Sequence, residues 1–205
     1  MSLFGEIQEN SIILLYGQSL DGKKEIICKY VEDSIKKNKP VVFVTTDHSA
    51  EAVKIDLVKN RVFYAKNIKF VDCQSSQSNE SLSDSEDVKR VPGPLALNEM
   101  SIAISDIERE YLRQNPKHSV IFDSLSTLLL YSNPQAIARF MQVIIVRIKN
   151  AGGSGVFTIE KNMHDEKVVA TILHIMDGLI EFKKEDGRIS IKTSGFGSGQ
   201  WQFLD

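Results

Sequence analysis

Residues 11–24 read Ser11-Ile12-Ile13-Leu14-Leu15-Tyr16-Gly17-Gln18-Ser19-Leu20-Asp21-Gly22-Lys23-Lys24. The first six residues form an apolar run that is typical of a buried parallel strand. The next seven follow the pattern of a phosphate-binding loop, in which backbone N–H groups hold phosphates and the lysine reaches the outer ones. A Ser or Thr that ligates Mg²⁺ normally comes next, but Lys24 stands there. The loop therefore keeps the groups that hold an anion and lacks one that normally places the metal.

A helix is expected directly after this loop. Apolar residues recur at intervals of three and four from Lys23 onward, and Pro40 ends the pattern. A glycine loop between a strand and a helix places an anion at the helix N-terminus. Two interpretations stay open, a phosphate site and a structural turn that binds nothing. On the first interpretation the candidate nucleotide-binding residues are Gly17, Asp21, Gly22, Lys23 and Lys24.

The rest of the chain alternates between strand and helix patterns. Strands are expected at 41–44, 68–71, 120–122, 156–159 and 201–203, and a hairpin at 179–192 around Glu185-Asp186-Gly187. Helices are expected from about Ser49, after Asn98 as N-cap, after Asn133 as N-cap, and near 168–175. This order predicts one α/β domain over residues 1–205, with a mostly parallel sheet covered by helices on both faces and an antiparallel C-terminal hairpin extension.

Composition narrows the class of protein. The chain has 205 residues, is 42% hydrophobic and 25% charged, and carries a formal net charge of −2. These values are ordinary for a soluble globular protein and do not indicate nucleic-acid binding, although a local basic patch stays open. Cys28 and Cys73 have neither metal-site spacing nor a disulfide framework, which favours the cytoplasm. No apolar run approaches the ~20 residues of a membrane span.

One segment is rich in serine and acidic residues. Gln74 to Pro94 contains six serines and four acids, with few apolar residues to offset the entropy of ordering. We expect a flexible surface loop at about 74–94. The alternative is a loop that binds a partner or faces a nucleic acid, and its acidity argues against the nucleic acid.

A second motif lies at the end of a later strand. His118-Ser119-Val120-Ile121-Phe122-Asp123 is an apolar strand that ends in an acid. In phosphate-loop nucleotidases such an acid holds Mg²⁺. An Asp at a strand end is also a common helix cap, so the interpretation as a metal-binding acid depends on the earlier Gly17 loop.

With these motifs the chain resembles the KaiC-like branch of the RecA-superfamily ATPases. The resemblance rests on Asp123-Ser124-Leu125-Ser126, on Phe4-Gly5-Glu6-Ile7, on His174-Ile175-Met176-Asp177-Gly178-Leu179-Ile180, and on Lys192-Thr193-Ser194-Gly195. It covers the chain from about Phe4 to Trp201. It implies a RecA-like fold of archaeal or bacterial type, ATP as ligand, and head-to-tail assembly with itself or with a RecA/KaiC-like relative.

The family's catalytic groups map onto this chain incompletely. Asp47 and His48 stand where the family carries a Glu-Glu pair that polarises the attacking water, so they are the candidate catalytic residues. Asp47 is one methylene shorter than Glu, and a base must come within hydrogen-bond reach of the water. The resemblance makes Asp123 the Mg²⁺ ligand, although the missing hydroxyl puts Mg²⁺ in doubt. It also makes Lys192 a phosphate contact in trans, while Ser194 replaces the partnering Arg.

These substitutions predict a nucleotide-binding protein with degenerate ATPase motifs and weak or absent ATP hydrolysis, acting as a switch or as an assembly or regulatory subunit. Two alternatives stay open, a non-catalytic scaffold paralogue and a DNA-associated recombination accessory. Lys24 either supplies charge near the phosphates or points into solvent. A polar loop at Glu160–Glu166 with His164 could hold a metal, but its spacing favours a solvated loop.

Overall fold

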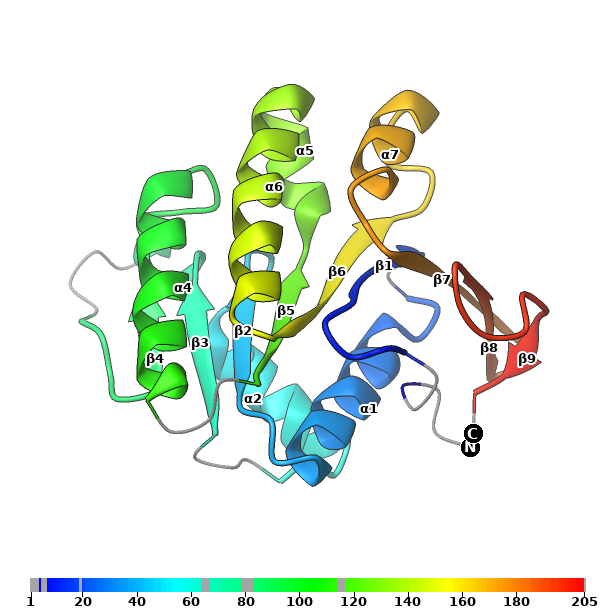
Figure 1. Ribbon diagram of the computed structural model, residues 1–205, viewed down its shortest axis with the longest axis horizontal. Helices are drawn as coiled ribbons and strands as arrows, with labels where there is room; N and C mark the ends of the chain where they lie inside the picture. Colours follow the sequence, from blue (N-terminus) through cyan, green and yellow to red (C-terminus); the bar gives the residue numbers. More distant parts are fainter. Residues whose placement is uncertain are drawn as a thin grey trace.

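The computed structural model describes residues 4, 7–18, 20–63, 67–78, 83–113 and 117–204. In these residues a sheet has the strand order β4-β3-β2-β5-β6-β1-β7-β8-β9 (Figure 1). The strands are β1 (Ile12–Gly17), β2 (Val41–Thr45), β3 (Ile68–Asp72), β4 (Val88–Arg90), β5 (Ser119–Asp123), β6 (Ser154–Glu160), β7 (Gly178–Glu185), β8 (Arg188–Ser194) and β9 (Gln202–Phe203). The helices are α1 (Lys23–Lys36), α2 (Ala50–Lys59), α3 (Ser75–Ser78), α4 (Leu97–Leu112), α5 (Leu125–Tyr131), α6 (Pro134–Asn150) and α7 (Glu166–Leu173).

The sheet is parallel from β4 to β7 and antiparallel at its C-terminal edge. β1 pairs in parallel with both β6 and β7, and β2 pairs in parallel with both β3 and β5. β7 and β8 form a hairpin whose turn is Asp186-Gly187, and both turn residues have positive φ, as a two-residue hairpin turn requires. The predicted mostly parallel sheet with an antiparallel hairpin extension is confirmed.

Two apolar cores lie on opposite faces of the sheet. Side chains alternate along β1, so Ile12 and Leu14 join one core while Ile13 and Leu15 join the other. Figure 1 shows α4, α5, α6 and α7 covering the first face, and α1 and α2 covering the second. Because helices cover both faces of the sheet, the central strands are apolar along their length. The apolar runs in the sequence indicated such buried strands.

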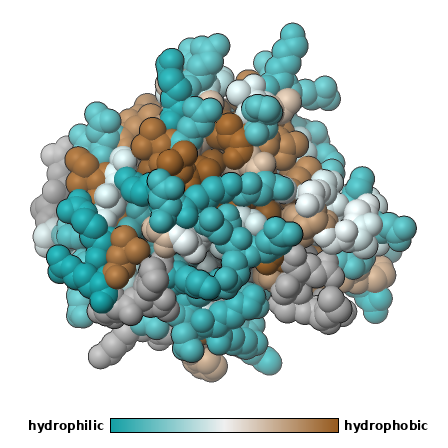
Figure 2. All heavy atoms as spheres, viewed as in Figure 1, coloured by the Kyte–Doolittle hydropathy of each residue, from teal (hydrophilic) through white to brown (hydrophobic). Residues whose placement is uncertain are grey.

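The outer surface of α4 and α6 carries apolar side chains. In Figure 2 apolar atoms gather between polar ones over these two helices. Ile102 of α4 and Val143 and Val146 of α6 are more than half exposed. Among the described helices, none combines the length and the apolar character that crossing a membrane requires.

Of the two N-caps that the sequence predicts, one is wrong and one is confirmed. Asn98 is not an N-cap, because the chain enters α4 through a turn in which the Ala96 N–H donates to the Gly93 carbonyl, and Ala96 takes the capping position. The Asn133 cap is confirmed, since its side-chain oxygen accepts from the Gln135 N–H at 2.9 Å.

The segment at 74–94 is not one continuous loop. It contains α3 and the edge strand β4, which pairs in parallel with β3 and buries Val88. Its charges are partly paired, since Asp87 contacts Lys54 at 2.8 Å and the Asp84 carboxylate accepts from the Arg90 N–H at 2.8 Å. Residues 79–82 of this segment, and Gly5 and Glu6 near the N-terminus, lie outside the described residues. The flexibility of the segment stays a prediction.

Candidate functional site

Both glycines of the phosphate-loop motif are required by their surroundings. A Cβ on Gly17, the last residue of β1, would lie 2.6 Å from Phe182. Gly22 has φ +100° and a Cβ there would lie 2.3 Å from Ile189. The Asp21 N–H donates to the Gln18 carbonyl at 3.0 Å, and α1 begins directly after Gly22 without a side-chain cap. Ser19 lies outside the described residues. The loop therefore turns tightly and delivers the chain into the N-terminus of α1.

Lys23 lies among three carboxylates from separate strand ends. Its ammonium nitrogen is 2.9 Å from Asp123 Oδ1, 3.2 Å from Glu160 Oε1 and 3.8 Å from Asp47 Oδ2. These acids, here called the acidic cluster, follow or end β5, β6 and β2, which are neighbours in the sheet. Parallel strands bring their carboxyl ends to one edge, so residues far apart in the chain meet there. Three carboxylates and one ammonium give this group a formal charge of −2.

Lys23 remains an ammonium in this environment. Burial of the side chain acts to lower its pKa, but the charges of Asp123, Asp47 and Glu160 outweigh burial and raise the pKa above its ordinary value. Lys23 is consequently a permanent cation at neutral pH. It lies one residue after the glycine loop, where an anion at the helix N-terminus would meet it.

Threonine hydroxyls hold two of the three acids, Asp123 and Asp47, in place. Thr158 of β6 donates to Asp123 Oδ1 at 2.7 Å. Asp47 Oδ1 accepts from the hydroxyl of Thr127 and lies 3.0 Å from the hydroxyl of Thr46. Asp47 is therefore held between the loop lysine and α5.

Lys24 points away from the acidic cluster. Its ammonium pairs with Asp56 Oδ2 of α2 at 2.5 Å, and its side chain is about half exposed. Adjacent residues of a helix point about 100° apart, so Lys23 and Lys24 diverge. Neither of the two expected positions of Lys24 describes it fully, because it is tied to a neighbouring helix.

The two remaining candidates lie apart from Lys23. His48 is exposed, and the next residue, Ser49, caps α2 by accepting from the Ala52 N–H at 3.2 Å. Lys192 lies on β8 opposite Glu181 of β7, so the structure places it on the C-terminal hairpin. The contact of Lys192 with the loop of a neighbouring subunit stays a prediction.

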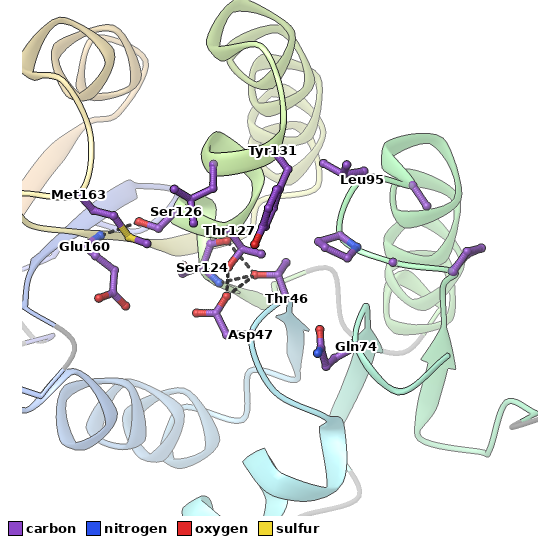
Figure 3. Close-up of a pocket in the computed structure, with 15 residues that line it drawn as sticks. Thr46, Asp47, Gln74, Leu95, Ser124, Ser126, Thr127, Tyr131, Glu160 and Met163 are labelled. Atoms are coloured by element: carbon purple, nitrogen blue, oxygen red, sulfur yellow. Dashed lines mark hydrogen bonds between the residues drawn. The ribbon is translucent and has the colours of Figure 1, made fainter. Parts of the chain in front are cut away.

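A cavity of about 830 Å³ lies beside the acidic cluster (Figure 3). Polar residues from the carboxyl ends of the strands, among them Asp47, Ser124 and Glu160, line one part of it. Apolar residues from the segment before α4, from α5 and from the loop after β6 line the rest: Pro92, Pro94, Leu95, Ala96, Leu130, Tyr131 and Met163. In Figure 3 Tyr131 reaches from α5 toward Thr127 and Thr46, with Leu95 on the opposite side.

The acidic cluster does not fit a Mg²⁺ ion as it stands. The Lys23 ammonium contacts all three carboxylates, and Asp123 Oδ1 also accepts from Thr158. In the part of the chain that the structure describes, no group of three or more His, Cys, Asp or Glu side chains is arranged to hold a metal. This also applies to the polar loop at 160–166, where Asp165 and Glu166 are exposed. Burial lowers the pKa of His164 in that loop, against the opposing charge of Glu160.

Comparison with known proteins places this geometry in a family. The model of one protein family matches residues 10–182, a span that runs from β1 into β7 and contains the loop and the acidic cluster. The chain belongs to the family of unknown function DUF7504. No curated protein matches the chain.

Solved structures share the fold of this DUF7504 member. It is similar to the KaiC-like protein PH0186 from the hyperthermophilic archaeon Pyrococcus horikoshii OT3, with TM-score 0.64, 12% identity, and coverage of 96% of this chain and 84% of that one. It is also similar to the uncharacterized protein PH0321 from Pyrococcus horikoshii, whose structure is in complex with an unknown peptide, with TM-score 0.66, 13% identity, and coverage of 94% and 86%. At this identity the likeness shows a KaiC-like, RecA-like fold.

Sequence reasoning missed Glu160 as part of the site. It was assigned to the polar loop after β6, whereas its carboxylate contacts Lys23. Glu160 directly follows the apolar run 156–159, so the sequence indicates that it lies at a strand end, but only the strand order, with β6 between β5 and β1, brings it to Lys23. The threonines that contact Asp47 and Asp123 lie close to the same strand ends: Thr46 directly follows β2, Thr127 lies on α5 and Thr158 lies on β6.

Proposed function

We propose that this protein binds a nucleoside triphosphate, with ATP as the expected ligand, at the Gly17–Lys23 loop and hydrolyses it weakly or not at all. The observation that carries the proposal is the buried Lys23 ammonium, held at the N-terminus of α1 beside Asp123. A cation, a tight glycine turn and an uncapped helix start converge there, and together they favour a phosphate group.

Phosphates must compete with the acidic cluster for Lys23. Three carboxylates already surround the ammonium and the group has a formal charge of −2. The acids therefore repel a phosphate that approaches Lys23. Among the described residues no second cation offsets this repulsion, because the neighbouring Lys24 is paired with Asp56. We expect affinity weaker than that of a loop whose lysine is free.

Weak hydrolysis follows from how Asp47 is held. Oδ1 of Asp47 is engaged by Thr127 and Thr46, and Oδ2 lies 3.8 Å from the Lys23 ammonium. A general base must reach the attacking water, and a short side chain held by three partners is poorly suited to do so. His48 is exposed beside the start of α2 and offers no better position.

On this proposal the protein works as a switch, or as an assembly or regulatory subunit. Head-to-tail packing with a second copy or a KaiC-like relative would bring Lys192 near the loop of the next subunit. Such a heterologous contact closes into rings or extends into filaments.

A non-catalytic scaffold is the second candidate function. The structure of PH0321 contains a peptide, and this chain has a large, partly apolar cavity at the carboxyl edge of its sheet. A DNA-associated role has less support, because the acidic cluster and the net charge of −2 oppose phosphate backbones.

Equilibrium titration with ATP, followed by a turnover assay on the same preparation, tests the proposal. We expect saturable binding and turnover well below ~1 s⁻¹, the low end of ordinary enzymes. Absence of binding at millimolar ATP would contradict nucleotide binding and favour the scaffold. Turnover at or above ~1 s⁻¹ would contradict the account of Asp47.

A further inference from the structure

The cavity beside the acidic cluster has a lining that nucleotide binding at the loop does not explain. Its volume of about 830 Å³ falls in the range of specific ligand pockets. It is lined by residues of α5 and of the segment before α4, neither of which belongs to the Gly17–Lys23 loop.

The apolar part of the cavity is open to solvent. Leu95, Leu130, Tyr131 and Met163 all line it, and each is more than two-fifths exposed, with Tyr131 at 68%. They come from three separate segments of the chain. Large apolar side chains that gather from several segments around one hollow mark an interaction site more often than scattered exposed residues do.

The polar part of the cavity favours a cation. Asp47 and Glu160 line it, and with Asp123 and Lys23 they belong to a group of formal charge −2. A hollow with low-dielectric walls focuses this negative field, so it attracts cations and repels phosphates. A ligand with an apolar body and a cationic end fits both parts.

One hydroxyl of the lining has no partner. Ser124 is fully buried and lines the cavity, and its Oγ makes no hydrogen bond within the described residues. Buried hydroxyls normally have a partner, so an unpartnered one at a cavity wall indicates where a ligand donor would bind. This observation is independent of the charge of the acidic cluster.

We propose that the cavity binds a lysine or arginine side chain, flanked by apolar residues, from an extended segment of a partner protein. Asp47, Glu160 and the Ser124 hydroxyl receive the cationic head, because carboxylates and a hydroxyl accept from its N–H groups. The aliphatic stem packs along Tyr131, whose ring also favours a nearby cation. Leu95, Leu130 and Met163 receive the neighbouring apolar residues. A small free amine would leave this apolar part of the cavity exposed to solvent, so a peptide segment fits the cavity better.

Fluorescence anisotropy with labelled pentapeptides tests this proposal without any nucleotide. The probe carries lysine between two leucines. Matched probes carry norleucine, which has the same stem without the charge, or glutamate. We expect the lysine probe to bind at least about tenfold more tightly than the norleucine probe, and the glutamate probe to bind more weakly still.

Variants of residues that line the cavity test whether the probe binds there. Glu160→Gln should weaken the lysine probe about tenfold and leave the norleucine probe nearly unchanged, because it removes charge and keeps shape. Tyr131→Ala should weaken both probes, because it removes the wall. The matched controls are Glu32→Gln on the outer side of α1 and Phe63→Ala, an exposed aromatic outside the cavity, and both should bind as the wild type does. Thermal unfolding of each variant confirms that it is folded.

Five results would overturn the proposal. The lysine and norleucine probes could bind equally, or neither could bind at millimolar concentration. Glu160→Gln and Tyr131→Ala could both leave binding unchanged. Free lysine could displace the probe as effectively as the unlabelled pentapeptide does, which would indicate a small-amine site. Tighter binding of single-stranded DNA than of the lysine probe would show that phosphates, not cations, are preferred.

Discussion

The ammonium of Lys23, at the start of α1, lies 2.9 Å from Oδ1 of Asp123, at the end of β5. The two residues are a hundred positions apart in the chain and meet because β1 and β5 both pair with β6. This contact unites the two halves of the predicted nucleotide site. Glu160 and Asp47 also contact the Lys23 ammonium, so a phosphate that binds Lys23 must displace these carboxylates or bind beside them.

Replacing Lys24 tests the role of the missing hydroxyl. Lys24→Thr supplies a hydroxyl directly after Lys23 and removes only a half-exposed ion pair with Asp56, of the kind that contributes about 0–1 kcal/mol. We expect nucleotide affinity to become more dependent on Mg²⁺, with little gain in hydrolysis because Asp47 and His48 are unchanged. The measurement is ATP affinity at zero and millimolar Mg²⁺ for both proteins. If the wild type already gains about tenfold from Mg²⁺, our account of position 24 fails.

The position of Lys192 predicts how copies associate. Lys192→Glu reverses a charge on β8, so head-to-tail assemblies should weaken. Because it also places a second carboxylate opposite Glu181 of β7, we expect a small fall in the melting temperature as well. Sedimentation velocity with and without ATP measures the association, and Lys36→Glu at the end of α1 is the control. A two-fold dimer that buries the Gly17 loop, unaffected by Lys192→Glu, would rule out head-to-tail packing.

Asp72 predicts a loss of stability in acid. This buried carboxylate accepts from the N–H groups of Ala50, Gln74 and Ser75 and from the Ser75 hydroxyl, at 2.6 to 2.8 Å. Burial acts to raise its pKa, but these hydrogen bonds together outweigh burial and lower the pKa. Since the folded pKa lies below the unfolded value of about 3.9, the contribution is complete above that pH and is lost as pH falls through the folded pKa.

Asp72→Asn should therefore lower the free energy of unfolding at pH 7 by about 1–3 kcal/mol, and the difference from the wild type should shrink as the pH falls below about 3.9. Urea unfolding at several pH values measures this, with the partly exposed Asp106→Asn as control. A difference that does not change with pH would mean that the charge of Asp72 contributes nothing.

Both cysteines should be unreactive in the folded protein. Burial, aided by the charges of Asp56 and Glu25, raises the pKa of Cys28 to about 12, and burial raises the pKa of Cys73 as well. The thiolate is the reactive form, so at pH 8 both thiols should react with a disulfide reagent only as fast as the protein unfolds. In guanidinium both should react at once. Rapid reaction of either thiol in the native protein would show that its surroundings open.

The sequence predicted an element correctly where a short pattern of residues is characteristic of that element. Apolar runs predicted the central strands, Asn133-Pro134 predicted the start of α6, and Asp186-Gly187 predicted the hairpin turn. β4 was missed because it has only three residues, of which Val88 alone is buried, inside a segment of polar composition. α5 was missed because it is short and follows β5 after one residue.

The candidate site was predictable only in part, because pairing across the sheet decides which side chains meet. The sequence motifs predict that Lys23 and Asp123 belong to the site. Glu160 joins them only because β6 lies between β5 and β1 in the sheet. The partner of Lys24 depends on the packing of α2 beside α1, which no local pattern encodes.

ATP affinity of a charge-matched pair of variants tests the central claim most directly. Lys23→Gln removes the ammonium but leaves three carboxylates unopposed, so charge alone could repel ATP. Lys23→Gln combined with Glu160→Gln returns the formal charge of the group to −2 without the ammonium. We predict that both variants, verified as folded by their melting temperatures, bind ATP at least about tenfold more weakly than the wild type and the Lys36→Gln control. Recovery of wild-type affinity in the double variant would contradict a direct contact between Lys23 and the phosphates.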